Sequence, residues 1–238
     1  KVLLERACRI ISDSIRARVM KATPLQAILA EFIGTFALVF AGCGACIVSQ
    51  VYPGSLSILG ISIVFGAVVG VMIYATGPIS GAHFNPAVTL GFLVSKRFAP
   101  RLVVPYILAQ LIAAALASSA HLILFPPGHD FGVTVPNLAL GSTVAIEAIL
   151  TFFLMFVIIA VATDARAASG FEGVAIGLTV TLCAAFGGPL TGASMNPART
   201  FGPAVVSGTF DGLGAYLVGP VAGALLAVGA FELLRVKE

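Results

Sequence analysis

The chain carries the stretch ISGAHFNPAVT at residues 79–89, and a related stretch, LTGASMNPART, follows at residues 190–200. In each copy a run of small residues containing Gly leads into Asn-Pro-Ala. Asn is a favoured helix N-cap, and Pro is best tolerated at the first helical position, where its missing N–H costs nothing. Each copy therefore predicts the start of a short helix, capped by Asn85 in the first copy and by Asn196 in the second.

Composition puts these two helix starts inside a membrane. The 238 residues are 59% hydrophobic and 10% charged, with a mean hydropathy of +1.08, whereas a soluble domain carries about a quarter charged residues. There is room for roughly six spans of about 20 residues, which argues against a soluble helical protein rich in Ala and Gly. The net charge of +3 does not point to nucleic acid. A helix that begins within the bilayer places the positive end of its dipole there, and its free N–H groups need polar protein groups or water nearby. Two such helices therefore indicate a pore.

The apolar runs predict six membrane-spanning helices. We expect them at about residues 25–48, 56–76, 102–125, 142–163, 173–186 and 212–234, with the two short helices after the second and the fifth. Basic residues cluster at both ends of the chain, after the first short helix and within 164–172, whereas the connections 49–55, 126–141 and 207–212 carry none. By the positive-inside rule, both termini are expected to be cytoplasmic.

The chain divides into a basic N-terminal segment and one membrane domain. Residues 1–22 interleave basic with apolar side chains. This pattern fits an amphipathic helix on the cytoplasmic surface of the membrane, or alternatively a flexible basic tail. Residues 23–238 are expected to form a single all-α transmembrane channel domain.

Two repeats are expected inside this domain, at about residues 25–125 and 141–235. They match outside the motif as well, because EFIGTF at 31–36 parallels EAILTF at 147–152. Three spans per repeat is an odd number, so the second repeat enters the membrane from the opposite side. Inverted repeats place their broken helices at the midplane, where the two Asn-Pro-Ala starts are expected to meet.

With these features assembled, the chain resembles the aquaporin, or major intrinsic protein, family over nearly its whole length. Paired Asn-Pro-Ala motifs about 110 residues apart, each within a Ser/Thr-Gly-Ala run, carry the resemblance. Residues 80–89 and 192–203 most resemble the nodulin-26-like branch and its bacterial relatives. The resemblance implies six tilted helices and two half-helices around a pore in each chain, and four chains in a homotetramer. Small residues of the first two spans suit close helix contacts in such a tetramer: Gly42, Gly44, Ala45 and Gly60.

The resemblance assigns both motifs to the centre of the pore: Asn85, Pro86, Ala87, Asn196, Pro197 and Ala198. A single-file pore replaces lost water hydrogen bonds with a line of acceptors, which backbone carbonyls of the non-helical stretches 77–84 and 188–195 can supply. The two Asn amides are expected to donate to a passing oxygen at the midplane. Such donors, with two positive helix ends behind them, orient water so that it cannot relay a proton, and they repel cations.

Counting from the motifs, the resemblance assigns four residues to the constriction, or selectivity filter: Phe65, Ala184, Ala193 and Arg199. Arg199 would donate to solute and exclude cations, and the alternative is an arginine that reaches the surface or pairs with a carboxylate. Two alanines imply a wider, less polar opening than the His and small polar or Cys residues of strict water channels. Two departures leave the solute open: Thr200 stands where glycerol channels carry Asp, and Phe65 where plant nodulin-26-like proteins carry Trp, Ala or Gly.

Several polar residues within the apolar runs have competing interpretations. Glu31 and Glu147 could form a proton relay, but the resemblance implies that each accepts hydrogen bonds from the adjacent re-entrant loop. His83 is expected to brace the first loop rather than to gate the pore. Cys43 and Cys46 have the spacing of a redox motif, yet their apolar setting favours helix packing. No metal site and no cofactor are expected, because no ligand groups fall at suitable spacing in one accessible stretch.

The sequence therefore predicts a passive channel, not an enzyme, for water and small uncharged solutes across a lipid bilayer. Candidate solutes are glycerol, urea and neutral metalloid acids such as arsenous acid, while protons and ions are excluded. A strict water channel is the nearest alternative. A secondary transporter would need a titratable or ion-binding group at the midplane, where the sequence offers two Asn amides and an Arg. A structural or junctional membrane protein would need more surface than the short loops provide.

Overall fold

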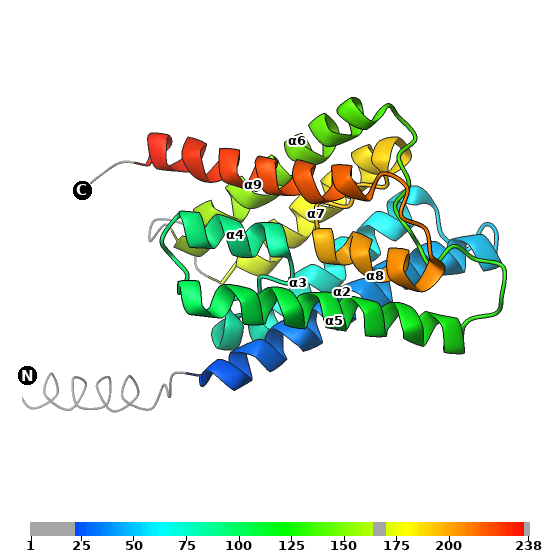
Figure 1. Ribbon diagram of the computed structural model, residues 1–238, viewed down its shortest axis with the longest axis horizontal. Coiled ribbons are helices and arrows are strands. Elements are labelled where there is room, and N and C mark those ends of the chain that lie inside the picture. The colour runs from blue at the N-terminus through cyan, green and yellow to red at the C-terminus, as the bar shows by residue number, and fades with distance from the viewer. Residues whose placement is uncertain (1–21, 164–169, 236–238) are drawn as a thin grey trace, which may run out of the picture.

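The computed structural model describes residues 22–163 and 170–235 of the protein. Within them the predicted all-α architecture is confirmed (Figure 1), with helices α2 (Pro24–Val51), α3 (Ile58–Ser80), α4 (Pro86–Val94), α5 (Pro100–Leu124), α6 (Leu140–Thr163), α7 (Glu172–Thr191), α8 (Pro197–Ser207) and α9 (Leu213–Leu234). Six of these helices are long and apolar enough to cross a membrane, and α4 and α8 are the two short ones. The amphipathic segment predicted for residues 1–22 lies, apart from its last residue, outside the described residues.

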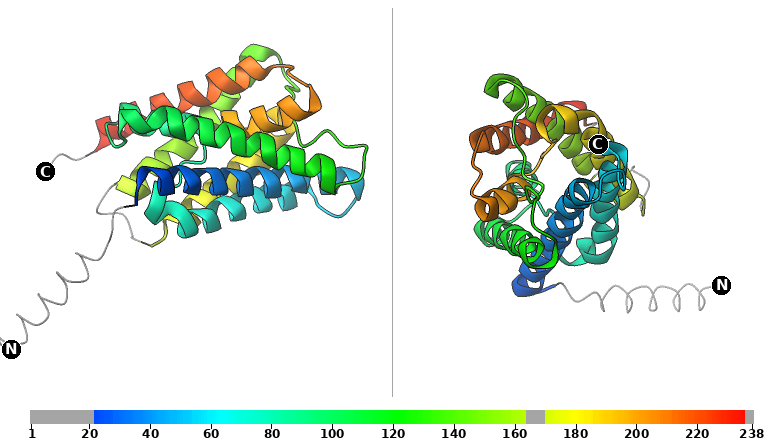
Figure 2. Two further views of the ribbon diagram at one scale, coloured as in Figure 1. Left: turned by 60° about the horizontal axis from the view of Figure 1, so that its bottom comes forward. Right: turned by 90° about the vertical axis from the view of Figure 1, so that its right-hand side faces the viewer.

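The long helices form a bundle, and the two short helices lie between α5 and α9 (Figures 1 and 2). Helices α2 to α5 follow the order long, long, short, long, and helices α6 to α9 repeat it. The most extensive contacts join α2 to α5, α6 to α9 and α3 to α7. The first two pairings are equivalent within the two repeats, and the third joins equivalent helices of different repeats. This arrangement is the one that a two-fold relation between inverted repeats produces, and it brings α4 and α8 into contact with each other.

Glycines let the long helices approach closely. A Cβ atom on Gly66 of α3 would lie 2.3 Å from the carbonyl oxygen of Gly177 in α7, and one on Gly223 of α9 would lie 2.0 Å from the carbonyl oxygen of Ala148 in α6. No side chain fits at these distances, so the backbones touch directly, as in other packed membrane helices.

Three of the small residues expected at a tetramer contact lie inside the protomer instead. An added Cβ on Gly42 would meet the Phe65 ring, and one on Gly44 would meet His121 of α5. Ala45 is only 5% exposed. The interpretation of these residues as an intermolecular surface is therefore wrong, because they are used to pack α2 against α3 and α5.

Helices α3 and α7 continue further than predicted, so the non-helical stretches before the two motifs are shorter: residues 81–85 and 192–196 in place of 77–84 and 188–195. Pro78 and Pro189 each lie in the last turn of their helix. Backbone groups inside a bilayer have no water to bond, so each helix continues until a glycine closes it. Gly81 and Gly192 adopt the left-handed conformation and donate their N–H to the carbonyl four residues earlier, at 2.9 Å.

The two non-helical stretches have the same unusual backbone. Positive φ angles occur three residues and one residue before each Asn, at Ala82 (52°), Phe84 (50°), Ala193 (43°) and Met195 (53°). Residues with a Cβ rarely adopt this conformation, which costs about 1–2 kcal/mol each. Its recurrence at equivalent positions means that both stretches follow one path, held by contacts that outweigh the strain.

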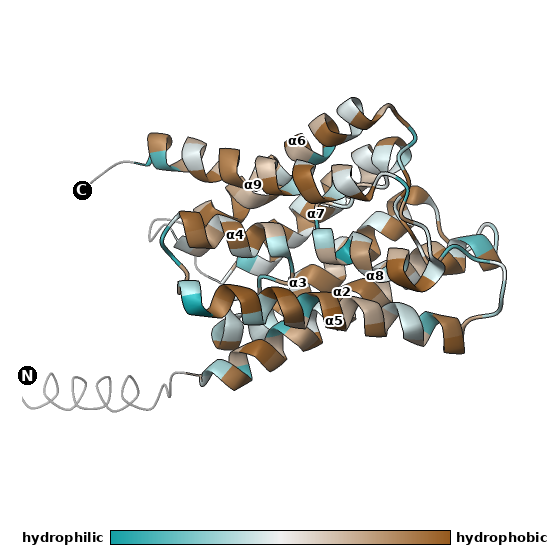
Figure 3. Cartoon of the chain, viewed as in Figure 1, coloured by the Kyte–Doolittle hydropathy of each residue, from teal (hydrophilic) through white to brown (hydrophobic). Residues whose placement is uncertain are grey.

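The distribution of polarity is that of a membrane protein. Large apolar side chains such as Leu122, Ile123 and Leu182 are 61–80% exposed on the outer surface, and hydrophobic residues run along the helices (Figure 3). A set of polar and charged side chains is buried, and Glu31 and Glu147 among them are 0% exposed. An apolar exterior suits lipid, while a polar interior must satisfy its own hydrogen bonds or line a water-filled path.

Candidate functional site

The centre of the site is the pair of helix starts. Asn85 is the N-cap of α4, and its Oδ1 accepts from the backbone N–H of Ala87 at 2.9 Å. Asn196 is the N-cap of α8, and its Oδ1 accepts from the N–H of Ala198 at 2.9 Å and of Arg199 at 3.3 Å. Pro86 and Pro197 occupy the first helical positions, where no N–H is needed. Since each amide oxygen caps its own helix, each amide nitrogen points away from that helix.

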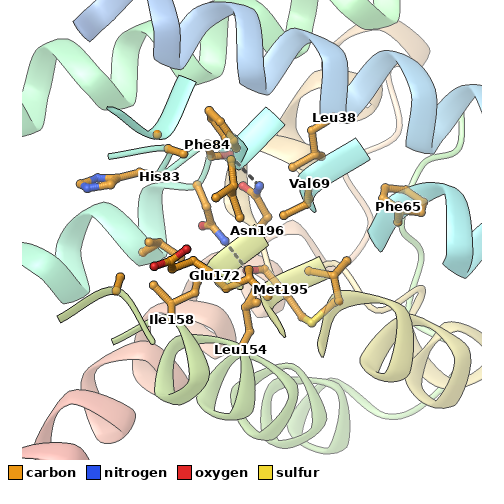
Figure 4. A pocket seen from close by; sticks show the side chains of 18 of the residues that line it. Leu38, Phe65, Val69, His83, Phe84, Leu154, Ile158, Glu172, Met195 and Asn196 are labelled. Carbon is orange, nitrogen blue, oxygen red and sulfur yellow. Dashed lines mark hydrogen bonds between the residues drawn. The ribbon is translucent and has the colours of Figure 1, made fainter. Parts of the chain in front are cut away.

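Each Asn amide nitrogen donates to the opposite loop. Asn85 Nδ2 donates to the carbonyl of Met195 at 2.7 Å, and Asn196 Nδ2 donates to the carbonyl of Phe84 at 2.8 Å. Figure 4 shows these two reciprocal bonds at the middle of the pocket. Each Asn amide nitrogen carries two N–H groups. One N–H of each residue forms the hydrogen bond that joins the two repeats. The second remains for a molecule in the cavity that both Asn residues line.

Glu31 of α2 accepts four hydrogen bonds around the first re-entrant loop. Its Oε1 accepts from Ser80 Oγ and the His83 N–H, both at 2.8 Å. Its Oε2 accepts from the Phe84 N–H at 2.7 Å and from Gln110 Nε2 at 2.8 Å. These donors fill the acceptor capacity of the carboxylate, and two of them are the N–H groups of consecutive residues just before Asn85 in the strained stretch.

Glu147 of α6 plays the equivalent part around the second loop. Its Oε1 accepts from Thr191 Oγ1 at 2.7 Å and from the Ser194 N–H at 2.9 Å. Its Oε2 accepts from the Met195 N–H at 2.7 Å. Both predicted carboxylates therefore contact the loops as bracing groups would, and neither lines the two cavities described below.

His83 is packed among aromatic side chains. Its ring stacks on Phe92 at a centroid distance of 4.8 Å and lies edge-on to Phe98 and Tyr106. Its Nδ1 is 3.1 Å from Thr89 Oγ1. Only 7% of the residue is exposed, and the ring points away from Asn196 in Figure 4. These contacts fit the predicted bracing of the loop, and His83 also borders the larger cavity.

Two cavities meet inside the bundle. The larger, of about 410 Å³, extends past both Asn residues to Tyr74 and Glu172 at one end of the molecule. The smaller, of about 270 Å³, is lined by Cys46, Gln50 and Asp130 among others. Four residues line both cavities and so mark their boundary, and they are the four predicted for the constriction: Phe65, Ala184, Ala193 and Arg199.

Arg199 is held inside this boundary. It lies in the first turn of α8 and is 4% exposed, which excludes an arginine that reaches the surface. Its Nη1 donates to the carbonyl of Gly132 at 2.7 Å, and its guanidinium carbon is 5.1 Å from the centroid of the Phe65 ring. Within residues 22–163 and 170–235 it forms no ion pair, so the alternative of a carboxylate partner finds no support there.

The connection between α5 and α6 contributes residues that the sequence pattern did not single out. It supplies the Gly132 carbonyl to Arg199 and places Thr134 Oγ1 2.9 Å from Thr200 Oγ1. Thr200 in turn bonds Ser194 in the second re-entrant loop. No local sequence signal marks these residues, because their role depends on a loop that lines the smaller cavity next to residues distant in the sequence.

The cysteines and other ligand-type residues do not form a metal centre in the described part of the chain. No group of three or more His, Cys, Asp and Glu residues lies together there. Cys43, Cys46 and Cys183 are free thiols. Cys43 is buried, and Cys46 lines the smaller cavity. Both thiols lie on helix α2, and they form no disulfide with each other.

The fold and the site define a polytopic membrane protein in which two half-helices meet beside two internal cavities that share four lining residues. The sequence pattern described as "Major intrinsic protein" matches residues 18–231, and the chain belongs to this family. Nodulin-26 of Glycine max is 48% identical over 216 residues, covering 90% of this chain and 79% of that protein. Aquaporin NIP1-1 of Zea mays is 47% identical over 220 residues, covering 92% and 78%.

A solved structure agrees with this assignment at the level of the fold. The aquaglyceroporin from Plasmodium falciparum matches with a TM-score of 0.76 at 24% identity, covering 88% of this chain and 96% of that one. The relatives are aquaporin-type channels of the nodulin-26-like branch, which are not enzymes. The resemblance stated from the motifs is thereby confirmed.

Proposed function

We propose that the protein is a passive channel for water and for small uncharged solutes, namely glycerol, urea and neutral metalloid acids such as arsenous acid. One observation carries the proposal. The boundary between the two cavities is formed by Phe65, Ala184, Ala193 and Arg199, and two of these four side chains are single methyl groups. Such a ring leaves space beside an aromatic wall and a fixed hydrogen-bond donor.

The chemistry of the path favours polar but neutral molecules. Apolar side chains such as Val69, Ile158 and Val180 line one part of it, while Asn85, Asn196 and the loop backbone line another. A polyol or urea can turn its polar groups to the donors and acceptors and its remaining surface to the apolar wall. An ion would lose its hydration shell without a matching set of ligands.

Exclusion of cations and protons follows from the same groups. A cation at the constriction would face the buried guanidinium of Arg199, and at the midplane it would face the positive ends of α4 and α8. The free N–H groups of Asn85 and Asn196 both donate to the oxygen of a central water. Such a water points both of its protons away from the Asn pair. Because its oxygen already accepts two hydrogen bonds, it cannot accept a proton from the neighbouring water in the single-file chain and pass one on.

The proposal also covers the orientation of the chain in the membrane and the assembly of chains into an oligomer. The described part of the chain begins and ends on the same side of the bundle, next to the α4–α5 turn with Lys96, Arg97 and Arg101 (Figure 1). We assign this basic side to the cytoplasm of a cell membrane. A homotetramer rests on the family resemblance alone, and native mass spectrometry of the detergent-solubilised protein would test it.

Stopped-flow light scattering on proteoliposomes tests the solute range. An osmotic step of sucrose should give shrinkage much faster than in empty liposomes. A step of glycerol should give shrinkage followed by fast re-swelling. Fast water flux with glycerol reflected would favour a strict water channel and would mean that the two alanines do not open the constriction.

A further inference from the structure

Gly42 of α2 lies against the aromatic wall of the constriction. A Cβ atom placed on Gly42 would be 2.1, 2.4 and 2.6 Å from Cε1, Cδ1 and Cζ of Phe65. Real Cβ atoms essentially never lie that close to a ring carbon, because nonbonded atoms in a packed interior stay near van der Waals distance. One side of the Phe65 ring therefore occupies the space that a side chain at position 42 would need.

The Phe65 ring also contacts Arg199. The guanidinium carbon lies over the ring at 5.1 Å from its centroid, within the range of a cation–π interaction. Arg199 itself is fixed by the Gly132 carbonyl. The ring is thus held at one side by the bare backbone of α2 and at its face by a buried guanidinium.

We propose that Gly42 is a specificity-determining residue that sets the width of the constriction through Phe65. Without a side chain at position 42, the ring can lie back against α2 and leave the path open. With a methyl group there, the ring moves toward the free space that it borders, which is the two cavities that meet beside it. Gly42 is a positioning residue, since Phe65 covers it and it lines neither cavity. The proposal rests on the function proposed above.

Movement of α2 away from the ring is the competing response, and the structure opposes it. An added Cβ on Gly132 would lie 3.0 Å from Cα of Cys43, so the α5–α6 connection packs directly on the backbone of α2 next to Gly42. The same helix carries Glu31 with its four hydrogen bonds. The side chain of Phe65, which borders open space, is the part with room to shift.

Gly44 provides a matched control on the same helix. Its added Cβ would lie 3.4 Å from His121 Nε2 and 3.9 Å from Phe125 Cζ, which is ordinary contact. Ala has a higher helix propensity than Gly at either position. Gly42→Ala and Gly44→Ala therefore make the same chemical change in the same helix, and only the first displaces Phe65.

The test is the ratio of glycerol to water permeability in proteoliposomes, which does not depend on how much of the protein is active. We expect Gly42→Ala to lower this ratio by about tenfold, the effect of one methyl group at a tight specificity site, and Gly44→Ala to leave it unchanged. The double variant Gly42→Ala/Phe65→Val should restore the ratio at least to the wild-type value, because the smaller side chain no longer reaches the path.

An unchanged ratio in Gly42→Ala would overturn the inference, and so would an equal loss in the double variant, since the effect would then bypass Phe65. If the wild-type protein passes no glycerol, the proposed solute range fails separately. A crystal structure of Gly42→Ala still decides the inference in that case. The Phe65 ring displaced into the cavities supports it, and the ring in its wild-type position with α2 shifted contradicts it.

Discussion

The carboxylate of Glu147 holds the second re-entrant loop by three hydrogen bonds, and replacing it with Gln breaks one of them. Gln has the same shape but one acceptor oxygen and one donor nitrogen. The better orientation puts the oxygen at the Oε1 position, which keeps the bonds from Thr191 and Ser194. The new amide nitrogen then faces the Met195 N–H, which in the wild type donates to Oε2 at 2.7 Å. That N–H is left without an acceptor.

The size of the effect follows from that count. One buried N–H left without an acceptor costs about 1–3 kcal/mol. Glu147→Ala leaves all three donors unpaired, on the order of 3–9 kcal/mol before the loop relaxes. The loop carries Ala193 and the carbonyl of Met195, so the same displacement should distort both the constriction and the bond to Asn85.

Two measurements check this prediction. Thermal unfolding of the detergent-solubilised protein, followed by circular dichroism, should give melting temperatures in the order wild type, Glu147→Gln, Glu147→Ala. Water permeability in proteoliposomes should fall in the same order. Glu232→Gln is the matched control, because Glu232 is exposed and its ion pair with Arg97 contributes about 0–1 kcal/mol.

Wild-type melting and wild-type permeability in Glu147→Gln would refute the reasoning. The strained backbone at Ala193 and Met195 would then be stable without the full set of carboxylate contacts. A loss of stability in Glu232→Gln as large as in Glu147→Gln would refute it too, since burial would not be the cause.

Three further variants test the path itself. The double variant Asn85→Asp/Asn196→Asp keeps both helix caps but replaces the central donors with acceptors, so a fluorescent pH dye in the vesicles should report proton entry above that of the wild type. Ala184→His adds a ring to the boundary of the two cavities, so glycerol permeability should fall more than water permeability in stopped flow. Arg199→Ala removes a barrier on the order of 4 kcal/mol for a cation about 4 Å away, so sodium flux should rise. Ion fluxes at the wild-type level in either of the charge-altering variants would contradict the assigned roles.

Much of the fold could be predicted because its signals are local. Long, continuous apolar runs form helices in a bilayer, and Asn followed by Pro favours the start of a helix. The ends of α3 and α7 could not be predicted from Pro78 and Pro189, since whether a helix tolerates Pro near its end depends on what satisfies the backbone around it. Gly81 and Gly192 were the better markers, because they supply the left-handed closure.

The site divides in the same way. The four residues predicted for the constriction were chosen by their position relative to the motifs, and all four line both cavities. The contributions of Gly132 and Thr134 were not foreseen, because they come from a loop distant in sequence from the residues they contact. We assigned Gly42 to an intermolecular surface, because the sequence of its helix reveals a run of small residues but does not reveal which neighbour they face. Only the contact with Phe65 reveals its place.

We propose that neutral molecules cross this protein by a passive path that ions and protons cannot follow. The most direct test measures water, glycerol and proton movement in one preparation of proteoliposomes, with and without imposed proton and sodium gradients. We expect water and glycerol rates well above those of empty liposomes and independent of both gradients, with proton entry equal to that of empty liposomes. Glycerol flux that follows either gradient, or proton entry that rises with the amount of protein, would contradict it.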